Sequence, residues 1–296
     1  MQVNRTRLVV AAYRLAVPLA SAIPPRVAYP LLDRVADLVR LTADGPRGAV
    51  EENLALVLGG RGRRHAWAVR GVFRHALRNY YDTFRLPAMS DDEIRQMVIL
   101  SGLRHLREAL TAGRGAILFS AHVSSVALAA QALALAERGG TVVVEAVEPP
   151  ELLDLMLRTR GSHGLRYSVL GPRLFRELTA TLRRNELVFL VVDRDVGGTG
   201  LPLDFFGRQT RLPTGPALLH LRTGAPVLPA YVSRRRDGRL DGIVGEPLQI
   251  TPTRSRRADM AGICRLVTAR LEYHIGRHPE QWTVLQRVWP SGHEAG

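Results

Sequence analysis

Residues 113–134 read GRGAILFSAHVSSVALAAQALA, and this stretch decides the fold class. The short, continuous apolar run Ala116–Ser120 is typical of a fully buried β-strand, and the segment Val123–Ala136 that follows it favours a helix. The two elements meet at His122. An imidazole at the carboxyl end of a buried strand lies where α/β folds usually bind ligands, although a structural histidine in a loop is about as common.

The same alternation continues towards the end of the chain. Further short β-type runs are expected at Val142–Val147, Leu187–Val192, Val227–Val232 and Leu240–Val244. Helices are expected at Pro150–Arg160, Pro172–Arg184, Thr214–Arg222 and Arg256–Arg277. Strands that alternate with helices predict an α/β domain over residues 96–296, with a mixed, largely parallel central sheet flanked by helices.

Residues 1–95 have a different pattern and are predicted to be helical throughout. Apolar spacing runs through Val27–Leu41, Val50–Leu58 and Trp67–Phe84, and breaks are expected at Pro24-Pro25, Gly45-Pro46 and Gly59-Gly60. No segment reaches the 18 or so uncharged apolar residues of a membrane-spanning helix. The segment Leu8–Ile23 comes closest, and it is either an amphipathic, shallowly inserted helix or an ordinary packing helix.

The formal net charge of +14 is carried by arginine, because the sequence contains no lysine. Guanidinium groups bind phosphates and carboxylates with two parallel hydrogen bonds, so the surface should attract nucleic acid, anionic lipid or a phosphorylated carrier. Nucleic acid is not expected as a partner, because the arginines are scattered and no recognition motif is present. The single Cys264 excludes a disulfide framework, and the dispersed histidines give no metal-ligand spacing, so neither metal nor cofactor is expected.

A second segment, residues 191–234, combines carboxylates with glycine-rich turns. An expected strand ends in Asp193-Arg194-Asp195, and a turn with three glycines follows. Next come the tetrapeptide Asp204-Phe205-Phe206-Gly207 and a helix start at Pro213–Pro216. Thr214 and Gly215 would offer unpaired main-chain N–H groups to a phosphate or an oxyanion.

Together these segments resemble the bacterial lipid A biosynthesis acyltransferases of the lauroyl/myristoyl type, a family that includes phosphatidylinositol mannoside acyltransferases. The resemblance covers nearly the whole chain. It is carried by Asn53 in EENLALVLG, by Tyr80-Tyr81-Asp82, by GRGAILFSAH, by DRD through DFFG to PTGPALLHLRTGAPVLPAYVSR, and by the closing HPEQWTVLQRVW.

The resemblance implies a fold like that of the glycerolipid acyltransferases and a function in lipid metabolism. The expected reaction moves a fatty acyl chain from acyl-CoA or acyl carrier protein to a hydroxyl of a membrane glycolipid, either lipid A-like or mannosylated phosphatidylinositol-like. The expected place is an anionic membrane surface on the cytoplasmic face of the plasma (inner) membrane. There the protein would be peripheral or anchored through its helical N-terminal, membrane-associating region.

The resemblance also implies a catalytic motif, in which a histidine is followed after four residues by Asp or Glu. His122 falls on the histidine, which serves as general base, but Ala127 stands where the family has its carboxylate. Asp193, Asp195 and Glu145 are the candidates to replace that carboxylate, since all three are expected at strand ends that face the same crevice. The alternatives are a slow enzyme with an unsupported base, and a catalytically impaired paralogue that binds lipid or acyl carrier without turnover.

The remaining candidates each have two interpretations. Arg194 could hold a phosphate of donor or acceptor, or form an ion pair with Asp193 or Asp195. Arg208 and Arg211, beside the turn at Gly207, could contact a headgroup or be solvated. Phe205 and Phe206 could line an acyl channel or pack in the core. Trp282 and Trp289 are predicted to pack the tail back on the domain.

Overall fold

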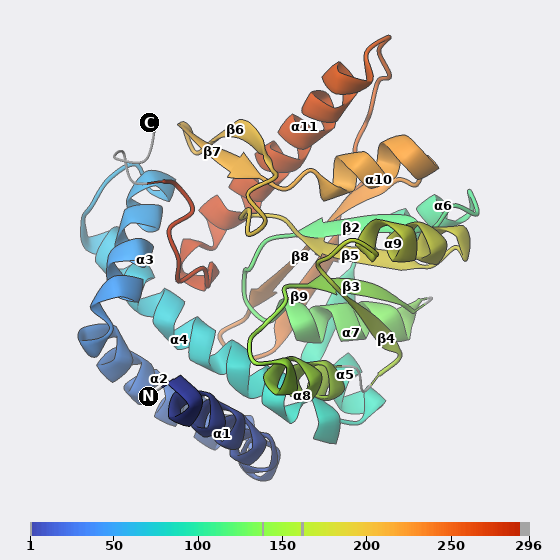
Figure 1. Cartoon of the computed structure of the whole chain (residues 1–296). Helices are drawn as coiled ribbons and strands as arrows, with labels where there is room; N and C mark the ends of the chain where they lie inside the picture. Colours follow the sequence, from blue (N-terminus) through green and yellow to red (C-terminus); the bar gives the residue numbers. More distant parts are fainter. Residues whose placement is uncertain (1, 138, 161–162, 291–296) are drawn as a thin grey trace.

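The computed structural model describes residues 2–137, 139–160 and 163–290 and has a seven-stranded sheet at its centre (Figure 1). The strand order is β1-β9-β8-β2-β5-β3-β4, and every neighbouring pair is parallel except β8–β9. The strands are β1 (Val98–Ser101), β2 (Ala116–Ser120), β3 (Gly140–Val144), β4 (Leu165–Val169), β5 (Leu187–Val191), β8 (Val227–Arg234) and β9 (Leu240–Val244). The predicted mixed, largely parallel α/β fold is therefore confirmed.

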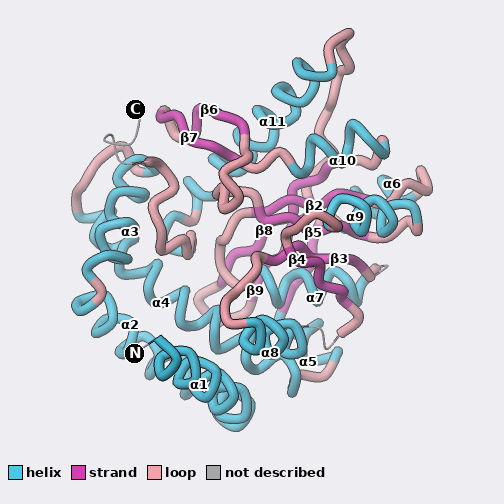
Figure 2. The backbone as a smooth tube through the Cα atoms, in the orientation of Figure 1, coloured by secondary structure: helices cyan, strands magenta, loops and turns pink. Residues whose placement is uncertain are grey.

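Helices cover both faces of this sheet (Figure 2). On one face, α9 (Leu174–Arg183) and α10 (Gly215–Thr223) pack on the central strands, and α11 (Arg256–Arg277) packs beside α10. On the other face lie α6 (Leu103–Leu110) and α7 (Val126–Ala136). Successive residues of β2 therefore enter two different hydrophobic clusters, which explains its uninterrupted apolar sequence.

Residues 2–97 form helices around one long central helix, α4 (Arg63–Arg85). Packed on it are α1 (Gln2–Ala22), α2 (Pro25–Thr42), α3 (Asp44–Val57) and α8 (Pro150–Arg160). The turn η1 (Leu86–Ala88) and α5 (Asp91–Met97), which begins with a Ser90 capping box, lead into the sheet. No described helix combines the length and apolar character needed to cross a membrane.

Several element boundaries differ from the prediction for local reasons. The break expected at Gly45-Pro46 lies two residues earlier, at Ala43, because α3 begins at Asp44 and the first turn of a helix tolerates proline. The strand expected at Val142–Val147 begins two residues earlier. There Gly140 packs so close to β5 that a Cβ atom would lie 2.5 Å from the Leu187 carbonyl oxygen.

Five helices and strands were not predicted: β1, α6, β4, and the strands β6 (Leu201–Phe205) and β7 (Arg208–Leu212), which form a separate antiparallel hairpin. The hairpin lies apart from the main sheet, next to α11 (Figure 2). Its strands mix polar and apolar residues because one side of the hairpin is exposed, so they lack the continuous apolar signal of the central strands.

Candidate active site

His122 and Asp193 are brought together by the pairing of two central strands. In the parallel pair β2–β5, Ser120 lies opposite Val191. Two residues further along each chain are His122 and Asp193, so the same register that aligns the strands places these side chains at equivalent positions beyond the sheet. The carboxyl edge of a parallel sheet is where α/β folds bind their ligands.

The Asp193 carboxylate accepts three hydrogen bonds. Its Oδ1 lies 2.7 Å from His122 Nδ1, and its Oδ2 accepts from the His122 main-chain N–H at 3.0 Å and from Trp282 Nε1 at 2.6 Å. The carboxylate is fully buried, whereas the imidazole side chain is 33% exposed. Burial by itself raises the pKa of Asp193, but the adjacent imidazole and the three donors outweigh it and bring the pKa below its ordinary value.

This geometry fixes the chemistry of the imidazole. An ionised carboxylate only accepts hydrogen bonds, so the proton of the neutral ring resides on Nδ1. Nε2 is then an unprotonated acceptor, and no described residue hydrogen-bonds to it. A buried acid that orients an accessible imidazole is the arrangement of a general base.

The loop after His122 is held by the closing segment of the chain. Thr283 donates from its main-chain N–H (2.8 Å) and from Oγ1 (3.0 Å) to the His122 carbonyl oxygen. Ser124 donates its N–H to the Gln281 carbonyl oxygen at 2.9 Å and has a φ of 54°. These constraints delay the start of α7 to Val126, three residues later than the apolar pattern predicted.

Trp282 is the residue of this site that sequence reasoning missed. It was predicted only to pack the tail on the domain, and its ring is indeed buried against Phe205. The overlooked signal is its indole N–H, because a buried indole almost always requires a hydrogen-bond acceptor.

The other two candidate acids do not reach His122. Glu145 pairs with Arg194, and Asp195 Oδ2 accepts from the Gly200 N–H at 2.7 Å and so closes the glycine-rich turn. Both were expected to face the same crevice, but each has its own partner. The ion pair expected between Arg194 and Asp193 or Asp195 was also wrong, because the Arg194 guanidinium reaches across to the loop after β3.

The predicted substrate-binding residues of the DFFG segment form the hairpin turn and its flanks. Phe205 is completely buried and stacks on Trp289 at 5.4 Å between ring centroids, so it is a core residue. Phe206 and Gly207 both have positive φ and make the turn. Arg208 and Arg211 are exposed. Arg208 donates to the Pro290 carbonyl oxygen at 3.2 Å, and Arg211 donates to the Gly200 carbonyl oxygen at 2.8 Å.

Thr214 and Gly215 lie where α10 begins. The helix leads into β8 and runs antiparallel to it, so its N-terminus is at the same sheet edge as His122. An ideal Cβ on Gly215 would lie 3.5 Å from a methyl group of Leu190 in β5. The Thr214 side chain makes no capping hydrogen bond.

Two cavities in the described chain do not include His122. One of about 440 Å³ opens at the carboxyl end of β4, the outermost strand on that side of the sheet, with Tyr167, Arg173 and Glu177 in its wall. The other, of about 200 Å³, lies between α4 and Glu280. Neither has His122 in its wall, so the ring faces solvent outside both.

Comparison with known proteins gives the class to which this fold and site belong. The family model of the bacterial lipid A biosynthesis acyltransferases matches residues 4–291, and the chain belongs to this family. It is therefore an acyltransferase.

Individual relatives are similar along most of the chain. The phosphatidylinositol mannoside acyltransferase of Mycobacterium tuberculosis is 34% identical over 218 residues, which are 72% of this chain and 67% of that protein. The lipid A biosynthesis palmitoleoyltransferase of Escherichia coli is 25% identical over 202 residues, 67% of this chain and 63% of that protein. A crystal structure of a 1-acyl-sn-glycerophosphate acyltransferase from Thermotoga maritima aligns with a TM-score of 0.36 at 14% identity, over 83% of this chain and 97% of that one.

Proposed function

We propose that this protein transfers a fatty acyl chain from acyl-CoA or acyl carrier protein to a sugar or inositol hydroxyl of a membrane glycolipid, with His122 as general base and Asp193 as its orienting acid. The observation that carries the proposal is the 2.7 Å contact between His122 Nδ1 and the buried Asp193 carboxylate. The names of the relatives support two acceptor classes, mannosylated phosphatidylinositol and lipid A.

The reaction follows from the orientation of the ring. The acceptor hydroxyl donates its proton to His122 Nε2 as its oxygen attacks the thioester carbonyl carbon. The resulting tetrahedral intermediate breaks its C–S bond, and the leaving sulfur takes the proton from the imidazolium. An ester and a free thiol result, and the ring returns to its neutral form.

Asp193 assists at two points of this cycle. Before the reaction it selects the tautomer in which Nε2 is unprotonated, and during the reaction its negative charge stabilises the imidazolium. Asp193 follows β5, the strand next to β2, which His122 follows, and its carboxylate takes the place of the acid that is missing at Ala127. This contact argues against the binding-only alternative.

The test is mass-spectrometric acyl transfer from palmitoyl-CoA to mannosylated phosphatidylinositol. We expect His122→Ala and Asp193→Asn to lower kcat by on the order of 10³–10⁴. Asp195→Asn is the matched control, because Asp195 lies on the same turn without touching His122, and we expect less than a tenfold effect. Equal activity of wild type and His122→Ala would end the proposal.

The other predicted residues receive roles around this centre. We assign Arg208 and Arg211, exposed on the hairpin, to the acceptor headgroup, and the N-terminus of α10 at Thr214 and Gly215 to a phosphate or the oxyanion. Arg194 would bind a phosphate of the acyl donor only if its guanidinium left the ion pair with Glu145. Residues 1–95 would hold the 96–296 acyltransferase domain on the cytoplasmic face of the plasma membrane.

A further inference from the structure

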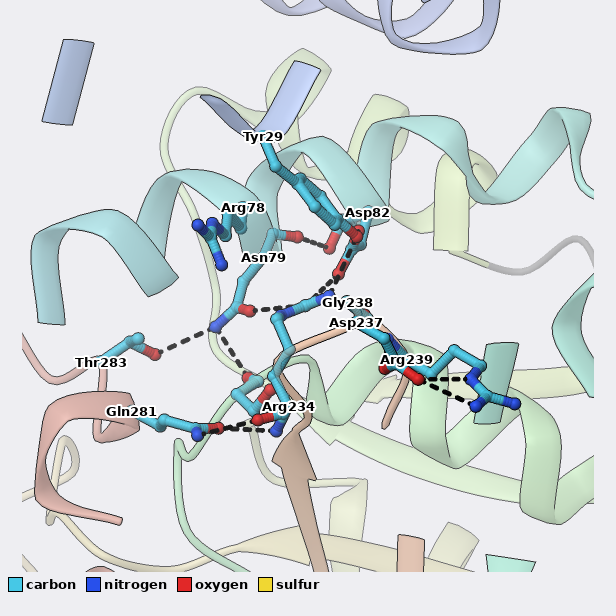
Figure 3. Close-up of polar contacts among 12 residues, drawn as sticks. Tyr29, Arg78, Asn79, Asp82, Arg234, Asp237, Gly238, Arg239, Gln281 and Thr283 are labelled. Atoms are coloured by element: carbon cyan, nitrogen blue, oxygen red, sulfur yellow. Dashed lines mark hydrogen bonds and ion pairs between the residues drawn. The ribbon is translucent and has the colours of Figure 1, made fainter. Parts of the chain in front are cut away.

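A buried polar network connects the N-terminal helices to the sheet (Figure 3). Its centre is Arg234, whose side chain is fully buried in β8 and forms an ion pair with Asp82 of α4. Arg234 Nη1 donates to the Tyr29 hydroxyl at 2.9 Å and to the Gly238 carbonyl oxygen at 2.9 Å, and the Tyr29 hydroxyl donates to Asp82 at 2.7 Å. Every charge in this cluster therefore has a partner, as buried ions require.

Asn79 extends this network to the loop that follows His122. Its Oδ1 lies 3.4 Å from Arg234 Nη2 (Figure 3). Its Nδ2 donates to the Ser124 carbonyl oxygen at 2.7 Å. Only this orientation of the amide satisfies both neighbours, since a guanidinium needs an acceptor and a carbonyl needs a donor. The shorter bond, to Ser124, is the stronger of the two.

A second series of hydrogen bonds leads from Arg234 through Gln281 to Ser124. The Gln281 side chain binds both main-chain groups of Arg234, accepting from its N–H at 2.7 Å and donating to its carbonyl oxygen at 3.1 Å. The main-chain oxygen of Gln281 accepts from the Ser124 N–H at 2.9 Å. Both backbone polar groups of Ser124 are thus held by residues that Arg234 fixes.

Ser124 needs such support because its backbone conformation is unfavourable. Its φ of 54° lies in the left-handed region, which residues with a Cβ rarely adopt without external constraint. Its hydroxyl is buried and has no hydrogen-bond partner in the described chain. The contacts that hold this conformation therefore come through the backbone: from Asn79 and Gln281, and from the Val126 N–H, which donates to the Ser124 carbonyl oxygen at 3.1 Å.

We propose that Asn79 is a positioning residue, which holds Ser124 in the left-handed conformation and thereby keeps the His122 ring against Asp193. The inference rests on the proposed function only in taking His122 as the base. Asn79 itself touches neither substrate nor the reacting atoms. Its effect passes through a turn two residues from the imidazole.

The test is a double-mutant cycle between Asn79→Ala and Ser124→Gly. Glycine adopts positive φ without steric strain, so it removes the need for the Asn79 hydrogen bond. In the Ser124 background we expect Asn79→Ala to lower kcat roughly tenfold or more with little change in KM. In the Ser124→Gly background the same substitution should cost less than about threefold.

A control variant distinguishes positioning from general stability. Asn53 is also buried and also binds the C-terminal segment, donating to the Gln286 carbonyl oxygen at 2.8 Å, but it does not contact the His122 loop. We expect any loss caused by Asn53→Ala to be unaffected by Ser124→Gly. Equal losses from Asn79→Ala in both backgrounds, or equal rescue of Asn53→Ala, would overturn the proposal.

Two further measurements keep the test decisive. If Asn79→Ala does not fold, Asn79→Asp keeps an acceptor for Arg234 but cannot donate to Ser124, and it should show the same dependence on Ser124→Gly. The NMR chemical shifts of the His122 ring nitrogens report the hydrogen bond to Asp193 and require no acyl transfer. These shifts should change in Asn79→Ala and return to the wild-type values in the double variant Asn79→Ala/Ser124→Gly. Unchanged shifts would refute positioning, whereas an active His122→Ala would refute only the proposed base.

Discussion

At the scale of single residues, the Asp193 carboxylate joins its own segment of the chain to the segments that carry His122 and Trp282. The His122 main chain, the His122 ring and the Trp282 indole all donate to one buried carboxylate. Charge-assisted hydrogen bonds of this kind are stronger than those between neutral groups. They keep the acid ionised where burial alone would favour its protonated form.

Removing the indole N–H tests whether this support matters for catalysis. We expect Trp282→Phe to leave the carboxylate one donor short, which destabilises the fold by about 2 kcal/mol and lowers kcat about tenfold. Urea denaturation and the acyl-transfer assay measure the two effects.

The matched control is Trp289→Phe in the same aromatic cluster. The Trp289 indole N–H donates to main-chain oxygens of Phe205 and Arg208, both at 3.1 Å, and does not reach Asp193. Its loss should lower stability by a similar amount while kcat stays within about twofold. If both variants lose kcat equally, the bond from Trp282 to Asp193 has no special part in catalysis.

The sequence predicted His122 and placed Asp193 among three acids, but it could not choose between them. The choice depends on which strands are neighbours and in which register, and Glu145 follows β3, which is not adjacent to β2. Asp195 is only two residues from Asp193, but its carboxylate bonds to Gly200. Local patterns carry no information about such pairings.

At the scale of elements, the closing turn η2 (Pro279–Gln281) fits against α4 through one glycine. A Cβ atom on Gly71 would lie 2.6 Å from Glu280 Cβ, closer than real Cβ atoms approach, and 3.1 Å from the Glu280 carbonyl oxygen. Gln281, Trp282 and Thr283 follow directly, and all three hold the His122 loop or Asp193. The packing of this helix on this turn therefore bears on the active site.

We expect Gly71→Ala to push the turn outward, lowering stability by about 1–3 kcal/mol and reducing kcat. Gly48 in α3 is the control, because a Cβ there would meet nothing within 4 Å. Gly48→Ala should instead stabilise the protein by about 0.5–1 kcal/mol without altering kcat. Urea denaturation measures the stability of both variants, and the acyl-transfer assay measures their kcat. A Gly71→Ala variant that is as stable and as active as the wild type would contradict this account.

The elements were predictable to different degrees for physical reasons. The bounds of β2, α8, β9 and α11 agree with the prediction, and β2 has the clearest signal because its apolar run is continuous. The β6–β7 hairpin was missed because its stability comes from packing on α11 and the tail, through contacts such as the bond from Thr210 Oγ1 to the Val288 carbonyl oxygen. Such long-range contacts leave no local period in the sequence.

At the scale of the whole molecule, α1 and α2 both expose large apolar side chains. Leu15 and Leu19 of α1 and Leu31 and Leu38 of α2 are 58–70% exposed. Arg14, Arg26 and Arg34 are exposed on the same two helices. Apolar side chains flanked by guanidinium groups suit the boundary between lipid headgroups and acyl chains.

We therefore expect the protein to bind vesicles that contain phosphatidylglycerol, and Leu15→Asp with Leu31→Asp to weaken binding by roughly tenfold per site. The control is Tyr273→Asp, which changes an equally exposed aromatic residue on a different helix, α11. Vesicle co-sedimentation measures the binding. Equal weakening by Tyr273→Asp would place the membrane contact elsewhere or make it non-specific.

The dependence of Asp193 on Trp282 has a consequence for biosynthesis. A ribosome delivers the proposed base first, the acid 71 residues later, and the Trp282 indole a further 89 residues later. Until that last segment arrives and closes over the carboxylate, a nascent chain can pair β2 with β5 and still lack a finished dyad. Premature termination before residue 282 should therefore silence the enzyme even where most of the sheet has already formed.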